Sequence, residues 1–382
     1  MTGTCVSRGL LSVLVLSAAA VLPASAEEWS KTYNVSANPE LRIETTDANI
    51  RVNTWDQNTI EAKVITSRYK IGEGGIQVQE HQTGNSVEIE VRYPHHNMNF
   101  GWSGSGHRVD IVVQMPRQGN VNLRTGDGNV ELADLKGTMN LHTGDGSETL
   151  DRIDGKLHAS TGDGHIRANG RFDELELKTG DGHVDAVARQ GSTMGANWRL
   201  ESGDGSVSLE LPPDLSADVD LHTGDGSIRL SNFKGKMDVR SGDGHQEIDD
   251  VDGSLRAQSG DGRIRAAGRF DGLEISSGDG SIDARALSGS AALSNWDLHA
   301  GDGSISLELP DNFAADVDLH TSDGHISLDM PITVEGRLGQ NNIHGKLNGG
   351  GKALTIHTGD GSIRLQKSMG TAFKFQIPVS GF

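Results

Sequence analysis

One motif dominates the chain: a small residue followed by Gly-Asp-Gly or Ser-Asp-Gly, which we call the kernel. It occurs twelve times, with spacings of 18, 18, 18, 23 and 21 residues, the same five again, and then 37. The residues of a catalytic centre normally occur once in a sequence. A motif that occurs in many copies therefore indicates a repeat architecture. The kernel aspartates are Asp127, Asp145, Asp163, Asp181, Asp204, Asp225, Asp243, Asp261, Asp279, Asp302, Asp323 and Asp360.

The repeated series of spacings marks a tandem duplication with an offset of 98 residues. "VNLRTGDG" matches "VDLHTGDG", "ANGRFDELE" matches "AAGRFDGLE", and Trp198 matches Trp296. After Asp323 the rhythm changes, and "GQNNIHG" near Asn341 stands where a further kernel is expected. A weaker copy, "IETTDANIRV", surrounds Asp47.

Each 18-residue unit contains two short runs in which apolar and polar residues alternate. In "GSIRLSNFKGKMDVRSGDG", Ile228 and Leu230 share one side, and Met237 and Val239 follow after a turn. Alternation with period two is typical of half-buried strands. At the kernel we expect glycine to supply positive φ and the aspartate side chain to bond its own backbone.

Two all-β folds compete for this pattern. An antiparallel meander would need about 24 strands in one sheet, whereas open sheets rarely exceed about 10. Coils of fixed length stacked on one another explain why the same residue types return at the same phase. We therefore predict a parallel β-solenoid with about 18 residues per coil. The longer coils would carry outward loops at "RQGSTMGANW" and "LPPDLSADV".

The first 26 residues are typical of a secretory signal peptide. Arg8 supplies the positive charge, Leu10 to Leu22 the apolar run, and Ala24-Ser25-Ala26 the cleavage site. The only cysteine, Cys5, lies in this segment, so the exported chain would contain no disulfide. We expect a periplasmic, cell-surface or extracellular protein.

The rest of the chain divides into three predicted parts. Residues 27–118 carry longer alternating strands and form an N-terminal β-region that caps the solenoid. Residues 119–367 form the solenoid with its tandem duplication. Residues 368–382 form a C-terminal capping strand.

The repeats resemble those of a known family. "LRIETTDANIRVNTWDQNTIEAKV", "RVDIVVQMPRQGNVNLRTGDGNVEL", the "[TS]GDGxI" coils and "NNIHGKLNGGGKALTIHTGDGSIRL" are similar to the bacterial putative-adhesin family of β-strand-repeat domains, whose function is unknown. The resemblance spans about Leu41 to Leu365. It implies an all-β, right-handed parallel β-solenoid (a β-helix or β-roll) at the cell envelope, and it brings no catalytic residues.

The net charge of the chain bears on which classes of partner it can bind. The formal net charge is −19, and nucleic-acid binding needs clustered Lys and Arg, so we expect no nucleic acid. No segment after the signal is apolar over the roughly 20 residues of a membrane span, so the mature chain should contain no transmembrane segment. The oligomeric state stays open.

The aspartate ladder is the first candidate site. Eighteen residues per coil with Gly-Asp turns resembles the calcium β-roll, in which both turns of a coil carry the motif. Here only one turn per coil is acidic, which is half of a calcium cage. We expect a structural turn that needs no bound ion, and keep a calcium-stabilised β-roll as the alternative.

Histidines are the second candidate. They flank the kernel on both sides, and three more share a Gly-rich loop. Stacked imidazoles could bind zinc, but Ser, Asn, Arg, Lys and Glu occupy the same phases in other coils, which indicates solvated positions. The histidines are His142, His222, His299, His320 and His357 before the kernel, His165, His183, His245 and His325 after it, and His95, His96 and His107 in the loop.

These observations favour a binding protein over an enzyme. Polysaccharide-active β-helices need charged groups at one unique place, whereas every acidic position here recurs coil after coil. We predict an exported, non-enzymatic, adhesin-like β-solenoid with no catalytic, cofactor or metal site. Its partner would be an envelope or surface protein or glycan. A β-helix enzyme acting on polysaccharide is the second alternative.

Overall fold

The computed structural model describes residues 26–94, 108–193, 197–213, 215–334 and 339–368. Within these ranges the chain is all-β, with 29 strands and no helix, and hence no helix that could cross a membrane. The predicted signal peptide, the loop with His95, His96 and His107, and the predicted C-terminal strand after Ser368 lie outside the described residues. Export therefore stays a prediction.

The strands fall into an N-terminal group and a repeat group. The N-terminal group is β1 (Ala26–Asn34), β2 (Glu40–Thr45), β3 (Asn49–Trp55), β4 (Thr59–Ser67), β5 (Gln77–Thr83), β6 (Ser86–Arg92) and β7 (Arg108–Pro116). The first half of the repeat group is β8 (Asn120–Thr125), β9 (Val130–Ala133), β10 (Lys136–Thr143), β11 (Glu148–Thr161), β12 (Ile166–Thr179), β13 (Val184–Ala188), β14 (Asn197–Ser202) and β15 (Val207–Glu210).

The second half repeats this order and adds an end. It contains β16 (Ser216–Thr223), β17 (Ile228–Ser231), β18 (Lys234–Ser241), β19 (Gln246–Ser259), β20 (Ile264–Ser277), β21 (Ile282–Ala286), β22 (Trp296–Ala300), β23 (Ile305–Leu309), β24 (Ala315–Thr321), β25 (Ile326–Leu328), β26 (Thr333–Val334), β27 (Asn342–Leu347), β28 (Ala353–Thr358) and β29 (Ile363–Lys367).

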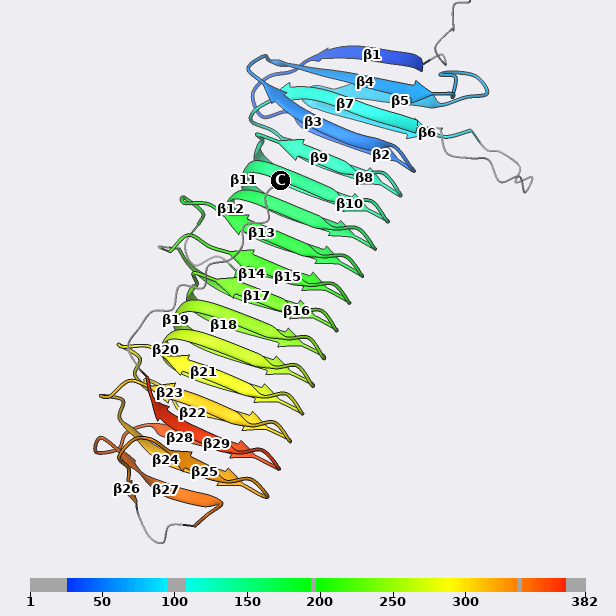
Figure 1. Cartoon of the computed structure of the whole chain (residues 1–382). Helices are drawn as coiled ribbons and strands as arrows, with labels where there is room; N and C mark the ends of the chain where they lie inside the picture. The colour runs from blue at the N-terminus through cyan, green and yellow to red at the C-terminus, as the bar shows by residue number, and fades with distance from the viewer. Residues whose placement is uncertain (1–25, 95–107, 194–196, 214, 335–338, 369–382) are drawn as a thin grey trace, which may run out of the picture.

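Successive coils stack in parallel and in register, which gives a solenoid-like rod (Figure 1). Met139 of β10 lies beside Val121 of β8, 18 residues earlier, and Met237 of β18 lies beside Val219 of β16 at the same offset. The 23-residue coil keeps this register by placing its extra residues in a loop after Ala188. The predicted coil length is confirmed. The predicted loops are confirmed in part, because Asn197 and Trp198 already belong to β14 and Ser216 to Val219 belong to β16.

The core is thin and repetitive. Most inward positions are Ile, Leu, Val, Ala or Met, with Phe and Trp at a few, and the predicted inward residues Ile228, Leu230, Ile282, Ile305 and Leu307 are all buried. Trp198 packs edge-on against Phe172, and Trp296 packs in the same way against Phe270, so the duplication extends to the aromatic contacts. Burial of two rows of aliphatic side chains per coil stabilises the stack.

The N-terminal strands continue the stack and close it. The coil β2–β3 stacks in parallel on β8 and β9. On its other side, β6 pairs with β2 and β7 pairs with β3, also in parallel. Antiparallel pairs then finish this end, with β5 on β6, β4 on β7 and β1 on β4. The weak kernel at Asp47 thus occupies a true coil.

The other end departs from the sequence prediction. The segment near Asn341 forms no coil turn, because β27 runs antiparallel to β24 and caps it. The last coil in sequence, β28–β29, is not the last in space: β28 lies between β22 and β24, and β29 lies between β23 and β25. In Figure 1 the red strands accordingly lie inside the orange end. Simple stacking in chain order was therefore the wrong expectation here.

Candidate interaction surface

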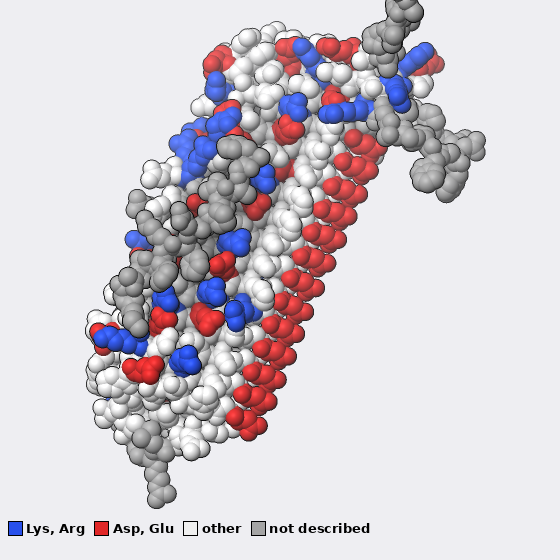
Figure 2. Space-filling model, viewed as in Figure 1, with Lys and Arg blue, Asp and Glu red and all other residues white. Residues whose placement is uncertain are grey.

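The kernel aspartates form one straight row, which we call the aspartate edge. All twelve, together with Asp47, are exposed at the same turn of consecutive coils. Figure 2 shows them as an unbroken acidic column along one edge of the rod. Because of the inserted coil, Asp360 stands between Asp302 and Asp323. Adjacent coils of a β-stack lie about 4.8 Å apart, so the row is a dense line of negative charge.

The kernel needs glycine because neighbouring coils stack closely at this turn, and not because its backbone has a positive φ. None of the residues that the structure describes with positive φ is a kernel glycine, so that part of the prediction is wrong. Instead, a Cβ on the second glycine would meet the carbonyl oxygen of the preceding coil, at 1.9 Å for Gly146 and 2.1 Å for Gly226. The first glycine donates its N–H to the same residue one coil back, at 2.5 Å from Gly162 to Gly144.

The first residue of most kernels is Thr or Ser, and its hydroxyl holds the turn. Thr161 Oγ1 donates to the carbonyl of Gly146 at 2.9 Å and accepts the N–H of Gly164 at 3.2 Å. Thr179, Ser202 and Ser259 repeat both contacts. The predicted turn, held by the aspartate side chain, is wrong: among the described residues, no kernel carboxylate makes a hydrogen bond or ion pair.

The aspartate edge therefore offers free carboxylates, one per coil. At the N-terminal end, burial and the negative charge of Asp127 raise the pKa of Asp47. Calcium prefers six to eight oxygen ligands, and one carboxylate per coil supplies few of them. Within the described ranges, no group of three or more His, Cys, Asp or Glu side chains is arranged to hold a metal ion. The geometry suits a diffuse cloud of cations along the edge.

At six kernels the residue that follows accepts a hydrogen bond from the backbone of the neighbouring coil. His165 Nδ1 accepts the backbone N–H of His183 at 3.0 Å, His183 Nδ1 accepts that of Ser206 at 2.9 Å, and His245 Nδ1 accepts that of Arg263 at 3.1 Å. Asn129 and Ser147 do the same with their side-chain oxygens. This explains why His, Ser and Asn recur at this phase: each can accept a hydrogen bond.

These contacts determine which nitrogen of each imidazole ring carries the hydrogen in the neutral form. A ring whose Nδ1 accepts a hydrogen bond carries its proton on Nε2, which is then a donor facing solvent. The rings of His165 and His183 lie parallel, with centroids 4.9 Å apart. On the other side of the kernel, His320 and His357 lie on neighbouring strands with centroids 5.7 Å apart. The exposed positions predicted for His165, His183 and His320 are confirmed.

A hollow of about 960 Å³ lies on the surface formed by the strands that come after the kernels in sequence. We call it the serine hollow. Its lining includes His183, Ser206, Ser208 and Ser227. Ser208 lies beside Asp185 of the neighbouring coil, which also lines the hollow. The lining also carries three cations, one further histidine and two further acids, so donors, acceptors and both charges meet there. These residues are Arg229, Arg263, Arg265, His245, Glu247 and Asp261.

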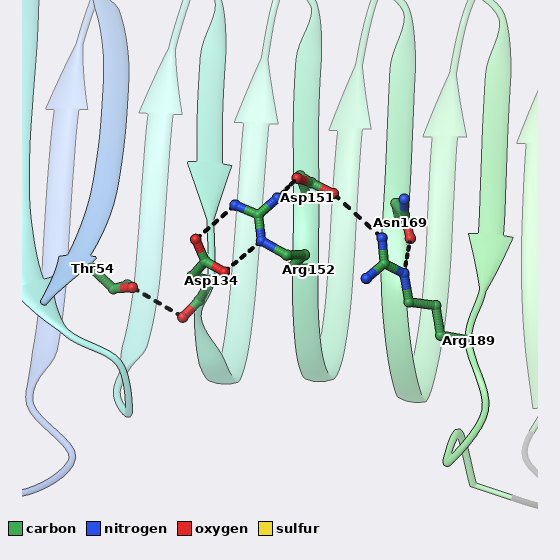
Figure 3. A network of polar contacts seen from close by, with 6 residues as sticks. All are labelled: Thr54, Asp134, Asp151, Arg152, Asn169 and Arg189. Atoms are coloured by element: carbon green, nitrogen blue, oxygen red, sulfur yellow. Dashed lines mark hydrogen bonds and ion pairs between the residues drawn. The ribbon is translucent and has the colours of Figure 1, made fainter.

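A second polar feature distinguishes the two halves of the duplication. Arg152 forms a two-point ion pair with Asp134, at 2.6 and 2.7 Å, and also contacts Asp151 (Figure 3). Arg189 lies 3.9 Å from Asp151 and donates to Asn169 at 2.6 Å. This network ties consecutive coils together at their turns.

The second half has no copy of this network. The matching residues are Asn232, Asp249, Asp250, Ala267 and Leu287, so both arginines are missing. Burial raises the pKa of Asp249, and the charges of Glu247 and Asp250 raise it further. The halves share a fold but differ in surface chemistry.

One carboxyl lies inside the rod. Glu148 is fully buried among the inward residues, and neither of its oxygens has a hydrogen-bond partner. Burial raises the pKa of Glu148 to about 8. At the matching position of the second half, Gln246 donates to Ser241 Oγ at 2.9 Å and to the carbonyl of Gln258 at 2.5 Å. An acid at a phase otherwise filled by Val, Ile or Gln was the available sequence signal.

The fold and surface define an all-β repeat protein built from stacked parallel coils. The chain belongs to the Toastrack DUF4097 family, whose model matches residues 117–216 and 214–366. This confirms the family resemblance of the sequence. No curated protein matches the chain at the sequence level.

Two solved structures are similar to this chain over most of its length. One, described as a "putative cell adhesion protein" from Clostridium sporogenes, is 11% identical, with 90% of this chain and 100% of that chain covered and a TM-score of 0.27. A "putative adhesin" from Parabacteroides merdae is 9% identical, with 89% and 96% covered and a TM-score of 0.29. Neither similarity assigns a function to this chain.

Proposed function

We propose that this protein is an exported, non-enzymatic, adhesin-like binding scaffold. In this proposal the rod is a right-handed β-solenoid over residues 119–367, preceded by the signal peptide of residues 1–26 and the capping region of residues 27–118, and followed by the strand of residues 368–382. Its surface binds a glycan of the envelope or of another surface.

The serine hollow carries the proposal. It combines serine hydroxyls, outward imidazole N–H groups and both signs of charge in a hollow of about 960 Å³. Arg229 and Arg263 face Glu247 and Asp283, so much of the charge is balanced within the rod. A lining of donors and acceptors with balanced charge suits a neutral polyhydroxyl chain better than a polyanion.

Repetition supports a binding role over catalysis. Acidic and basic side chains recur at fixed phases along the coils, whereas hydrolysis of a polysaccharide needs one unique pair of carboxyl groups. The carboxyl with the largest pKa shift, Glu148, lies in the core, where no substrate reaches it.

The test uses the duplication as its control. Ser208→Trp would fill the hollow, and Ser306→Trp places the same side chain at the matching position of the second half, outside the residues that line it. We expect the wild-type protein and Ser306→Trp to bind the same glycans on an array, and Ser208→Trp to lose them. Equal binding by both variants would refute the assignment to the hollow.

The same preparation tests the alternatives. Release of shortened oligosaccharides from a bound glycan would indicate a polysaccharide-active enzyme. Binding to proteins from envelope extracts, with no binding on the array, would replace the glycan by a protein partner.

A further inference from the structure

Two histidines that line the serine hollow also hold neighbouring coils together. His183 Nδ1 accepts the backbone N–H of Ser206 at 2.9 Å, and His245 Nδ1 accepts that of Arg263 at 3.1 Å. Both histidines are exposed, so protons from the solvent reach their rings. A ring nitrogen accepts a backbone N–H only while it carries no hydrogen of its own. Each of these bonds between coils therefore exists only with the neutral imidazole.

Other coils make the same bond with side chains that do not titrate. Asn129 Oδ1 accepts the backbone N–H of Ser147 at 2.8 Å, and Ser304 Oγ accepts that of Ser362 at 3.2 Å. Imidazole is the side chain that ordinarily changes its charge between pH 5 and 8, whereas an amide or a hydroxyl does not. The bond between coils is thus sensitive to mild acid at the serine hollow and insensitive at the asparagine and serine coils.

Unpaired carboxylates lie beside His183. They belong to the kernels of its own coil and of the two adjacent coils, Asp181, Asp163 and Asp204, and none of them makes a hydrogen bond or ion pair among the described residues. On the strands that follow, Asp185 is already paired with Arg167 at 3.8 Å. The ring of His165, the other titratable group that His183 faces, stacks on it with centroids 4.9 Å apart. A protonated ring therefore finds a carboxylate partner at this turn.

His245 has similar surroundings. Kernel carboxylates without a partner lie on its own turn and on the adjacent turns, and they belong to Asp225, Asp243 and Asp261. Its strand and the adjacent strands carry both charges, on Arg229, Glu247, Arg263 and Arg265. Arg229 is already paired with Glu247 at 3.3 Å, and Arg263 with Asp283 at 3.7 Å. The unpaired charge beside His245 is therefore mainly negative.

We propose that His183 and His245 form a proton-operated switch in the wall of the serine hollow. In one state each neutral ring binds the backbone of the next coil. In mild acid each ring gains a proton on Nδ1, releases that backbone N–H and turns towards the kernel carboxylates. Because both states have hydrogen-bond partners, the ring is a two-state element that a change of pH can shift.

The switch changes the chemistry of the hollow. Three arginines and three acids line it, so the charges of the lining balance while both imidazoles are neutral. Two protonated imidazoles leave an excess of positive charge, and two bonds between coils are lost in the same step. The hollow then differs in charge and in shape from the one that suits a neutral polyhydroxyl chain. This effect on binding rests on the proposed function, whereas the switch itself does not.

The backbone amides of the full-length protein test the switch. Nitrogen-15 NMR from pH 8 to pH 5 follows the amides of Ser206 and Arg263, with the Ser147 amide, bonded to Asn129, as the internal control. We expect the Ser206 and Arg263 amide protons to shift upfield in mild acid. Their hydrogen exchange should become several-fold faster relative to Ser147. Amides that stay as protected as that of Ser147 over the whole range would overturn the proposal.

Asparagine variants separate the ring from the bond. His183→Asn and His245→Asn should fold, because asparagine already makes this bond after the first kernel. We expect the pH dependence of the Ser206 and Arg263 amides to disappear in them. His222→Asn, at an exposed position on the other side of a kernel, is the matched control and should keep the response. A response that persists in His183→Asn and His245→Asn would refute the assignment to these rings.

The kernel carboxylates are tested in the same way. Asp181→Asn and Asp243→Asn remove the negative charge of the kernel that precedes each ring, and we expect the amide transitions to move to lower pH because the protonated ring loses its partner. Unchanged transitions would overturn the second state of the switch. None of these measurements contains a ligand, so absence of binding on a glycan array would refute the proposed function and leave the switch standing.

Discussion

Replacing Glu148 by glutamine should stabilise the protein in a strongly pH-dependent manner. In the unfolded chain this carboxyl has its ordinary pKa of 4.5, whereas burial raises the folded pKa to about 8. The folded state therefore keeps a proton that the unfolded state releases. The contribution of Glu148 to stability is fully present below pH 4.5 and is lost as the pH rises through 8.

The magnitude follows from the two values. At pH 7, holding the carboxyl neutral costs about 3 kcal/mol, and above pH 8 the cost approaches about 5 kcal/mol. Glutamine avoids this cost and can donate to Thr143 Oγ1 and the carbonyl of Ser160, which match the acceptors that Gln246 uses. Glu148→Gln should thus add about 3 kcal/mol at pH 7 and almost nothing at pH 4.

Urea unfolding followed by circular dichroism from pH 4 to 9 measures this difference, and hydrogen exchange of the β11 amides reports it locally. The reverse change, Gln246→Glu, is the matched control: it should introduce the same pH dependence into the second half. Parallel pH profiles for wild type and Glu148→Gln would refute the reasoning, since they would mean that the buried carboxyl titrates alike in both states.

Four further outcomes test the stack. Ile305→Asp places an unpaired charge in the core, where Ile305 is 1% exposed, and should cost several kcal/mol, so an unchanged melting curve would contradict stacking. Thr223→Ala removes a buried donor to the Gly205 carbonyl and should cost about 1–3 kcal/mol in urea unfolding, whereas Asp225→Asn should be neutral or stabilising; the opposite order would restore the aspartate as the turn-forming residue. Excess chelator should lower the melting temperature only slightly, with sodium chloride restoring it, while complete unfolding rescued by calcium but not sodium would establish ion cages. Deletion of residues 219–316 should leave a shorter folded rod by circular dichroism and sedimentation, because β14–β15 and β22–β23 are equivalent, and aggregation would argue for one indivisible domain.

The sequence by itself determined the repeat and its phase. Alternation with period two set which side chains point inward, and Ile228, Leu230 and Ile305 lie where that period places them. The recurrence of the kernel at one phase of each coil set the register, and an exposed acidic row follows from it. These features are local or periodic, so one sequence contains all the information that they require.

The tertiary structure decided what each repeated residue does. Glycine in a turn suggests positive φ, yet only the neighbouring coil shows that a Cβ on Gly226 would meet the Gly205 carbonyl at 2.1 Å. The aspartate side chain makes no bond in its own turn, and the buried hydroxyl two residues earlier, such as that of Thr223, bonds the backbone instead. Such roles depend on contacts between coils, which no single repeat encodes.

The order of coils at the C-terminal end also belongs to the tertiary structure. β24 and β16 have almost the same sequence, yet β16 stacks on β14 while β24 stacks on β28. A strand accepts any in-register neighbour with matching inward residues, so its own sequence leaves the choice open. The position of β28 between β22 and β24 depends on how all coils at this end pack together. In this position β28 pairs with a strand on both sides, and the burial of its inward residues stabilises the arrangement.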